Sequence, residues 1–265
     1  DVNKAPFSKI QRPEALGIIL GVEEYRYAPD VTFARNDARS MRDYFVRTLG
    51  IPDSRIYFRI DQEATQGEFR KIFDPSQGWL AKRITPGMTE VFIYYVGHGA
   101  PDISTGDLYL MPSDSDPNYP ATSYRLAELY RSLEQLPVKQ ATVFLDACFS
   151  GRVGRGRQVE MLLAGARGIG VQPRQARIGE NTMVLTASAG NQVSSGYPVK
   201  AHGLFTYFLM LGLQGEADAD NDRTITMQEL YIYVRQRVGT EAGLLDREQT
   251  PELLGNGLGR VLVRY

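Results

Sequence analysis

A histidine and a cysteine that together could perform nucleophilic chemistry each follow an apolar run typical of a buried β-strand. His98 stands between two glycines after residues 91–96, and Cys148 follows closely after residues 141–145. A free thiol, with a pKa near ~8.5, is a modest nucleophile at neutral pH, and a neighbouring imidazole helps it to reach the thiolate state. The backbone amides of Gly99 and Cys148 are then candidates to stabilise a developing oxyanion.

Each of these two residues has an ordinary structural explanation when it is taken alone. Cysteine is among the most frequently buried residue types, and a histidine after an apolar strand is often a satisfied core residue. Their joint position is more informative. The carboxyl ends of parallel strands share one edge of a sheet, where α/β proteins also bind ligands, so His98 and Cys148 are expected to meet there.

The elements that must position this pair alternate between strand-like and helix-like patterns. Strands are predicted at residues 16–22, 55–60, 90–96, 141–145, 183–187 and 260–265, the last of which is expected to close the sheet. Helices are predicted at residues 36–50, 67–83, 126–136, 204–213 and 227–238, with Pro75 interrupting the second. This alternation favours the α/β class, with a mostly parallel sheet covered by helices on both faces.

The length of the chain suits one domain preceded by a short arm. We expect residues 1–14 to form an N-terminal arm and residues 15–265 to form a single domain. Two long connections interrupt it. Residues 101–122 are polar and are expected to form a surface loop, and residues 152–180 carry six arginines, two glutamates and six glycines. Connections of this length in a compact domain are usually functional or disordered.

The composition argues against several classes of function. The chain has 265 residues and a net charge of −1, which argues against a general nucleic-acid surface and a polybasic membrane anchor. One cysteine and two histidines exclude an internal disulfide framework and nearly exclude a His/Cys metal cluster. No apolar run approaches the roughly 18 residues of a membrane span and no signal peptide is visible, so a cytoplasmic location is favoured.

Two motifs resemble those of a known family. Tyr-Tyr-Val-Gly-His-Gly at 94–99 and Asp-Ala-Cys-Phe-Ser-Gly at 146–151 resemble the paired motifs of caspase-like peptidases, and the separation of 50 residues between His98 and Cys148 matches the caspase spacing. The Asp-x-Cys pattern is nearer to metacaspases and bacterial caspase-like proteins than to animal caspases. The resemblance covers residues 16–265. It implies a three-layer α/β/α caspase–hemoglobinase fold with about six strands, and a dyad of Cys148 as nucleophile and His98 as general acid–base, with no third catalytic member and no cofactor required for the chemistry.

By the same resemblance, two acidic residues read the side chain that precedes the cleaved bond. Asp146 matches the acid of the Asp-x-Cys motif, and Asp37 matches the acid that opens the first helix, where metacaspases read Arg or Lys. Two carboxylates at one pocket favour a cationic guest, and arginine can be held by two parallel hydrogen bonds. The structural alternative for Asp37 is a capping role in the first helical turn. A carboxylate beside a thiolate raises the pKa of the thiol, which is unfavourable for a nucleophile. The position of Asp146 therefore favours a functional role over a purely structural one.

Two further segments lie near the expected site. The stretch 186–196, followed by Tyr197, resembles the wall of the substrate cleft in this family, although no single residue in it can be assigned. His202 is expected to have a structural role, helping to start the helix at Leu204.

The arginine-rich connection at about 152–180 has two open interpretations. It is a solvated loop, or it is the linker that the family cuts between a larger and a smaller portion. The second interpretation is consistent with the expected specificity, because an arginine-specific enzyme could cut at the arginines of its own linker. The favoured sites of self-cleavage are Arg157, Arg167, Arg174 and Arg177.

A segment that resembles an EF-hand calcium loop lies between two predicted helices. The acids Asp218, Asp220, Asp222 and Glu229 occupy loop positions 1, 3, 5 and 12. The departure is Arg223 at position 6, where such loops require glycine for a sharp turn. The segment is therefore either a Ca²⁺ site formed by these four acids or a plain helix connection that keeps the pattern.

The leading hypothesis is a monomeric cysteine endopeptidase that cleaves proteins or peptides after exposed Arg or Lys and processes itself, with no nucleic-acid or membrane partner. One alternative is a caspase-like pseudopeptidase or a calcium-responsive binding scaffold, although a pseudopeptidase has little reason to keep both His98 and Cys148. The other is a CHAT- or clostripain-type relative, which shares the dyad and differs in its specificity pocket.

Overall fold

The apolar runs of the sequence become neighbouring strands of one central sheet. The structure is a computed structural model, and it describes residues 1–265 apart from 151, 156–157, 162–175 and 191. The strands of the sheet, in sequence order, are β1 (Leu16–Gly21), β2 (Ile56–Ile60), β3 (Glu90–Val96), β7 (Gln140–Asp146), β10 (Thr182–Thr186) and β14 (Glu252–Gly255). In space their order is β14-β10-β7-β3-β1-β2. All neighbours are parallel except the antiparallel pair of β10 and β14, which confirms the expected mostly parallel sheet.

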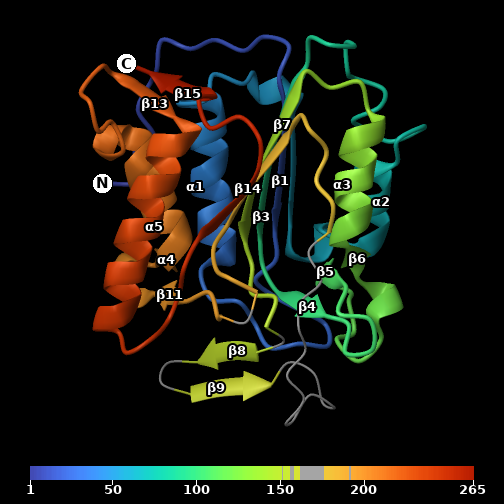
Figure 1. The fold of residues 1–265 in the computed structure, drawn as a ribbon. Helices are drawn as coiled ribbons and strands as arrows, with labels where there is room; N and C mark the ends of the chain where they lie inside the picture. The colour runs from blue at the N-terminus through green and yellow to red at the C-terminus, as the bar shows by residue number, and fades with distance from the viewer. Residues whose placement is uncertain (151, 156–157, 162–175, 191) are drawn as a thin grey trace.

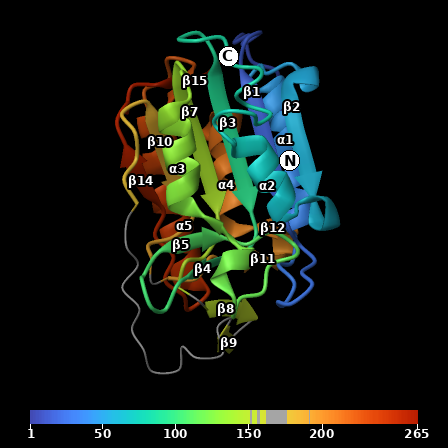
Figure 2. The same ribbon diagram turned by 90° about the vertical axis from the view of Figure 1, so that its right-hand side faces the viewer.

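Helices cover both faces of this sheet (Figures 1 and 2). They are α1 (Ala34–Arg47), α2 (Gln66–Phe73), α3 (Leu126–Gln135), α4 (Leu204–Leu211) and α5 (Met227–Leu244). Side chains alternate along a strand, so Tyr94 of β3 packs in the core beneath α1, α4 and α5, whereas Tyr95 packs in the core beneath α2 and α3. This arrangement is the three-layer α/β/α architecture that the sequence predicts.

The strand that ends the sheet is not the one predicted. We expected residues 260–265 to close the sheet, but β15 (Val261–Arg264) pairs antiparallel with β13 (Thr224–Thr226) in a separate two-stranded sheet. The edge position belongs to β14, which has only four residues, none of them fully buried. A segment so short and so partly covered shows little apolar periodicity, and this explains the error.

Two other expected elements differ from the structure. The helix predicted at 67–83 ends at Phe73, because Pro75 disfavours helical backbone at the residue before it. The connection at 101–122 is not simply a polar surface loop. It contains β5 (Leu108–Leu110), which lies between β4 (Gly99–Pro101) and β6 (Tyr124–Arg125) in a small antiparallel sheet, and it buries Met111.

Short elements gather where the carboxyl ends of the central strands lie, at the bottom of Figure 1. The hairpins are β8 (Arg152–Arg155) with β9 (Gln158–Met161), and β11 (Gly196–Tyr197) with β12 (His202–Gly203). The described residues also form short helical turns at Asp53–Arg55, Asp61–Glu63, Pro120–Thr122 and Pro198–Lys200, and a π-helical turn at Gly212–Glu216.

The N-terminal arm lies against α1. Val2 and Ala5 are buried, and the Tyr44 hydroxyl donates a hydrogen bond of 2.8 Å to the carbonyl oxygen of Val2. The Thr48 hydroxyl donates a second hydrogen bond to the arm, of 2.7 Å, to the carbonyl oxygen of Pro6. These contacts fix the arm beside the helix that carries Asp37.

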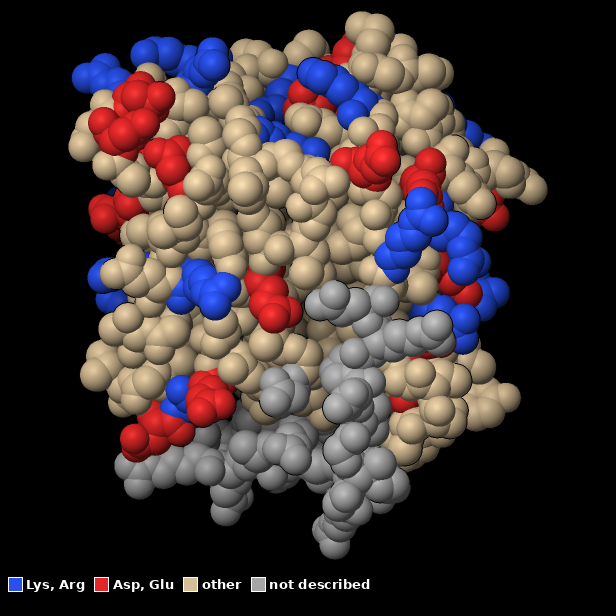
Figure 3. Space-filling view, viewed as in Figure 1, with Lys and Arg blue, Asp and Glu red and all other residues tan. Residues whose placement is uncertain are grey.

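The surface carries mixed charges. On the face shown in Figure 3, basic and acidic side chains are interspersed rather than gathered into a field of one sign, in keeping with the net charge of −1. Among the residues that the structure describes, no helix combines the length and apolar character needed to cross a bilayer.

Candidate functional site

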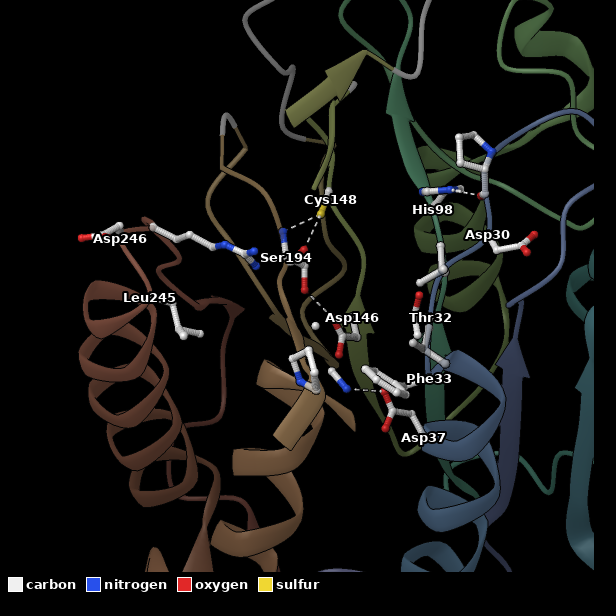
Figure 4. A pocket seen from close by; sticks show the side chains of 18 of the residues that line it. Asp30, Thr32, Phe33, Asp37, His98, Asp146, Cys148, Ser194, Leu245 and Asp246 are labelled. Carbon is white, nitrogen blue, oxygen red and sulfur yellow. Dashed lines mark hydrogen bonds between the residues drawn. The ribbon is translucent and has the colours of Figure 1, made fainter. Parts of the chain in front are cut away.

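The register of two central strands brings His98 and Cys148 to the same edge of the sheet. β3 and β7 are adjacent and parallel, and Val96 pairs with Asp146 at the end of their ladder. His98 and Cys148 each follow two residues later. Both line a pocket of about 720 Å³, and Figure 4 shows them entering it from neighbouring strands. The two side chains therefore line one pocket at this edge of the sheet.

His98 is held by groups that the sequence analysis did not identify. The carbonyl oxygen of Pro29 lies 2.7 Å from Nε2 and accepts its hydrogen, which leaves Nδ1 as the unprotonated nitrogen. The backbone N–H of His98 donates to the Tyr25 hydroxyl over 2.7 Å, and the two rings are 4.7 Å apart. Burial lowers the pKa of His98 to about 4, so its imidazole is neutral at pH 7.

Cys148 is in contact with the backbone of Ser194. The backbone N–H of Ser194 donates to Sγ, and Sγ lies 3.6 Å from the carbonyl oxygen of the same residue. Burial raises the pKa of the thiol to about 12; the Ser194 amide opposes this rise and the nearby Asp146 carboxylate adds to it. Within the described part of the chain no hydrogen bond joins His98 to Cys148. The resting site therefore holds a neutral thiol and a neutral imidazole.

Asp146 lies at the base of this pocket with both carboxylate oxygens engaged. Oδ1 accepts a hydrogen bond of 2.6 Å from the Ser194 hydroxyl, and Oδ2 accepts one of 2.6 Å from Thr206. Burial raises the pKa of Asp146, and these two hydroxyl donors counteract the rise. The carboxylate is thus fixed two residues before the thiol.

Asp37 also lines the pocket, and its bonds exclude the helix-capping explanation. Its two oxygens accept from His202 Nδ1 at 2.6 Å and from the backbone N–H of Gly203 at 2.8 Å, so they bond to β12 and not to the first turn of α1. Burial raises the pKa of Asp37 to about 7; the His202 bond opposes the rise, and the charge of Asp146 adds to it.

Gly203 shows how closely the two carboxylates approach the same point. A Cβ atom on this residue would lie 2.6 Å from Asp146 Oδ2 and 3.0 Å from Asp37 Oδ2. Two buried carboxylates around one point disfavour each other's charge unless a cation lies between them. The base of the pocket is therefore chemically suited to a guanidinium or ammonium group.

The expected oxyanion glycine has a different position. Gly99 does not line the pocket; it is buried in β4, and a Cβ atom there would lie 2.7 Å from the carbonyl oxygen of Cys148. Gly97 is the glycine of this motif that lines the pocket. Gly99 is thus required for the close approach of β4 to the backbone at Cys148.

The arginine-rich connection is described only in part. Arg157, Arg167 and Arg174 lie outside the described residues. Arg177 is described: its side chain is 87% exposed and lies 3.6 Å from the carboxylate of Glu134. It is therefore accessible from solvent.

The EF-hand-like loop partly keeps the geometry that its sequence indicates. Three aspartates bring carboxylate oxygens within 4.8 Å of one another: Asp218, Asp220 and Asp222. Arg223 adopts a φ of 65°, so the backbone makes the left-handed turn that glycine usually supplies. Glu229 is not one of these three. Its Oε2 accepts from the N–H and hydroxyl of Thr226 in a capping box, and its Oε1 accepts from the backbone N–H of Ala219 in the loop at 3.3 Å. Oxygen donors of this kind suit Ca²⁺.

Several residues of the site were missed by sequence reasoning. Ser194 and Thr206 orient Asp146, and Ser194 lies in the stretch 186–196 that resembles a cleft wall but offers no distinctive pattern. His202 was expected to help to start the helix at Leu204. It directly precedes Gly203, the N-cap residue of that helix, and its ring pairs with Asp37, a partner that was not expected. Such pairs between distant segments have no local sequence signal.

Comparisons with known proteins identify the family and the fold of the chain. The sequence model of the caspase-domain family matches residues 15–263. No curated protein sequence matches the chain at a significant level. Among solved structures, a protein from Geobacter sulfurreducens superposes with a TM-score of 0.66 at 16% identity, covering 95% of this chain and 99% of that one. Caspase-1 from Spodoptera frugiperda superposes with a TM-score of 0.63 at 17% identity, covering 99% and 94%. At these identities the structural likeness establishes the fold.

Proposed function

Because the chain belongs to the caspase family, a family of cysteine peptidases, we propose that it is an active endopeptidase that cleaves protein substrates after arginine or lysine. The observation that carries this proposal is the composition of one pocket. A histidine, a cysteine and two buried acids all line it: His98, Cys148, Asp37 and Asp146.

The neutral resting state of the pair suggests how the reaction would start. As Sγ of Cys148 attacks the carbonyl carbon of the substrate, Nδ1 of His98 takes the thiol proton. The same proton then passes to the leaving amine, and a thioester remains on the cysteine. Water, deprotonated by His98, attacks the thioester and releases the acid product and the thiol. The Pro29 carbonyl keeps the imidazole oriented through both steps and stabilises its charged form.

The two acids would supply the specificity. A guanidinium between Asp37 and Asp146 would offset part of their negative charge and lower the pKa values of both carboxyls towards the ordinary range. Arginine is preferred over lysine in this proposal because its planar donors can reach both carboxylates at once. The same preference would allow the enzyme to cut its own arginine-rich connection, as the resemblance to metacaspases implies.

A calcium response is the second proposal, and it is compatible with the first. It rests on the three carboxylates of the EF-hand-like loop, which lie within 4.8 Å of one another. The loop begins after the turn that follows α4 and leads into α5, so an ion there would act on the helices that support the pocket.

The direct test is hydrolysis of fluorogenic tetrapeptides that end in Arg, Lys, Asp or Leu. We expect cleavage after Arg and Lys only. Asp37→Asn and Asp146→Asn should each lower kcat/KM for the Arg peptide by about 10- to 100-fold, because a desolvated charged hydrogen bond is lost. Asp43→Asn removes an exposed acid from the same helix and should retain the wild-type value. Cleavage after Asp, or equal rates for all four peptides, would refute the proposed specificity.

A further inference from the structure

A line of polar side chains joins the N-terminal arm, at the exposed Asn3, to the buried base of the pocket. His202 has no exposed surface, and its two ring nitrogens face different partners. Nδ1 lies 2.6 Å from Asp37 Oδ1, and Nε2 lies 3.1 Å from Asn3 Oδ1. Asn36 Nδ2 is farther from Nδ1, at 3.4 Å, and donates instead to the carbonyl oxygen of Ala201 at 2.8 Å.

This geometry matters because Asp37 is 1% exposed and has few donors. A buried carboxylate keeps its charge only when hydrogen bonds or opposite charges favour it. His202 and the backbone of Gly203 supply these bonds. In accordance with this role, the His202 bond opposes the rise in the pKa of Asp37 that burial causes.

The imidazole is in turn oriented by the arm. Asp37 Oδ1 lies 2.6 Å from Nδ1 and Asn3 Oδ1 lies 3.1 Å from Nε2, so rotation of the ring would break both contacts. The Ser40 hydroxyl donates a hydrogen bond of 3.2 Å to the same oxygen of Asn3. The arm therefore forms part of the support behind the pocket, although it does not line the pocket itself.

We propose that His202, held by Asn3 of the N-terminal arm, is the positioning residue that keeps Asp37 charged and aimed at the basic side chain of the substrate. This inference rests on the proposed Arg/Lys specificity and adds to it a residue and a chain segment that do not touch the substrate. The arm is then a determinant of selectivity as well as of packing.

Four variants separate this role from packing. His202→Phe removes both ring nitrogens from a buried site of similar shape. His202→Asn keeps a donor at the place of Nδ1 and loses the bond to Asn3. Asn3→Ala releases the ring from the arm. Tyr44→Phe is the matched control, because it removes another buried hydrogen bond of the arm, to Val2, without reaching His202.

Two measurements are made on each variant. The first is KM and kcat for the Arg tetrapeptide. The second is the affinity of the same variants, carrying Cys148→Ala to prevent turnover, for peptides ending in Arg and in Leu, measured by calorimetry. We expect His202→Phe to weaken Arg binding and raise KM by about 10- to 100-fold with little change in kcat. His202→Asn should recover most of the affinity, Asn3→Ala should give an intermediate loss, and Tyr44→Phe should bind as the parent does.

The outcomes distinguish this inference from the function on which it rests. If the Cys148→Ala parent binds Arg and Leu peptides equally, the proposed specificity fails and the inference fails with it. If the parent prefers Arg but Asn3→Ala and His202→Asn both match Tyr44→Phe, the specificity stands and the inference alone is overturned. These two variants decide the matter even if His202→Phe does not fold.

Discussion

Nε2 of His98 donates its hydrogen to the backbone carbonyl of Pro29 across 2.7 Å, so a peptide oxygen, with no net charge, orients the imidazole. A carbonyl fixes the tautomer without adding the negative charge of an aspartate. Burial lowers the pKa of His98 to about 4, although the Pro29 carbonyl and the charge of Asp30 oppose this effect. The base is kept neutral and ready to accept a proton.

The first prediction concerns this pair. Cys148→Ala should abolish peptide cleavage, and His98→Ala should lower kcat/KM by about 10²- to 10⁴-fold, the range for a general acid–base. Cys148→Ala should retain the wild-type near-ultraviolet circular dichroism, since this change is small. Residual activity in a clean Cys148→Ala preparation would rule out the dyad.

The pH dependences of kcat and KM should separate. Because burial lowers the pKa of His98 to about 4, kcat should stay near its plateau until the pH approaches that value. Because burial raises the pKa of Asp37 to about 7, this carboxyl loses its charge as the pH falls through neutrality, and KM for an Arg peptide should rise there. Steady-state rates from pH 4 to 8 measure both, with Asp37→Asn as the control whose KM should be flat. A fall of kcat near the ordinary histidine pKa of ~6.5 would contradict the assignment.

The thiol should be slow to alkylate. Burial raises the pKa of Cys148 to about 12, so the thiolate fraction near neutral pH is far below that of an ordinary cysteine. Iodoacetamide incorporation, followed by mass spectrometry between pH 7 and 9, measures this directly, since the chain has one cysteine. The reference is the same protein unfolded in urea. Equal rates in the folded and unfolded protein would show that the thiol is exposed and ordinary.

Calcium should raise the thermal stability of the protein if the loop at Asp218 holds an ion. Binding to the native state alone stabilises it by about 2.7 kcal/mol at a hundredfold excess over Kd. Asp218→Ala should remove this shift in Tm and leave hydrolysis without calcium unchanged, whereas magnesium should act more weakly because it prefers a stricter geometry. A Tm that millimolar calcium leaves unchanged identifies the loop as a plain connection.

Incubation of the wild type should produce two fragments that remain associated. A linker that belongs to the same chain as an Arg-specific site is presented to that site at a high effective concentration. Among the candidate sites Arg177 is the one that the structure describes, and its exposure suits cleavage. Sequencing of the new N-termini, beside Cys148→Ala as control, locates the cut. An intact wild type that still cleaves Arg peptides would show that the connection is not a substrate.

The sequence predicted the layers and the site edge well because these depend on local patterns. The run 90–96 is apolar and ends at a glycine, and it forms β3 with the predicted bounds. The edge strand β14 was missed because its four residues carry too short a pattern. The pairing of His202 with Asp37 was missed for a different reason: 165 residues separate the two, and such contacts are determined by packing.

The shared register of β3 and β7 also constrains how relatives of this chain could vary in length. Val96 and Asp146 form the last pair of the ladder. His98 follows Val96 by two residues, and Cys148 follows Asp146 by two residues. One inserted residue after either strand would turn its side chain away from the other. Insertions and deletions should therefore accumulate in the connection between the two strands, which contains the loops around β5, while these two offsets stay constant.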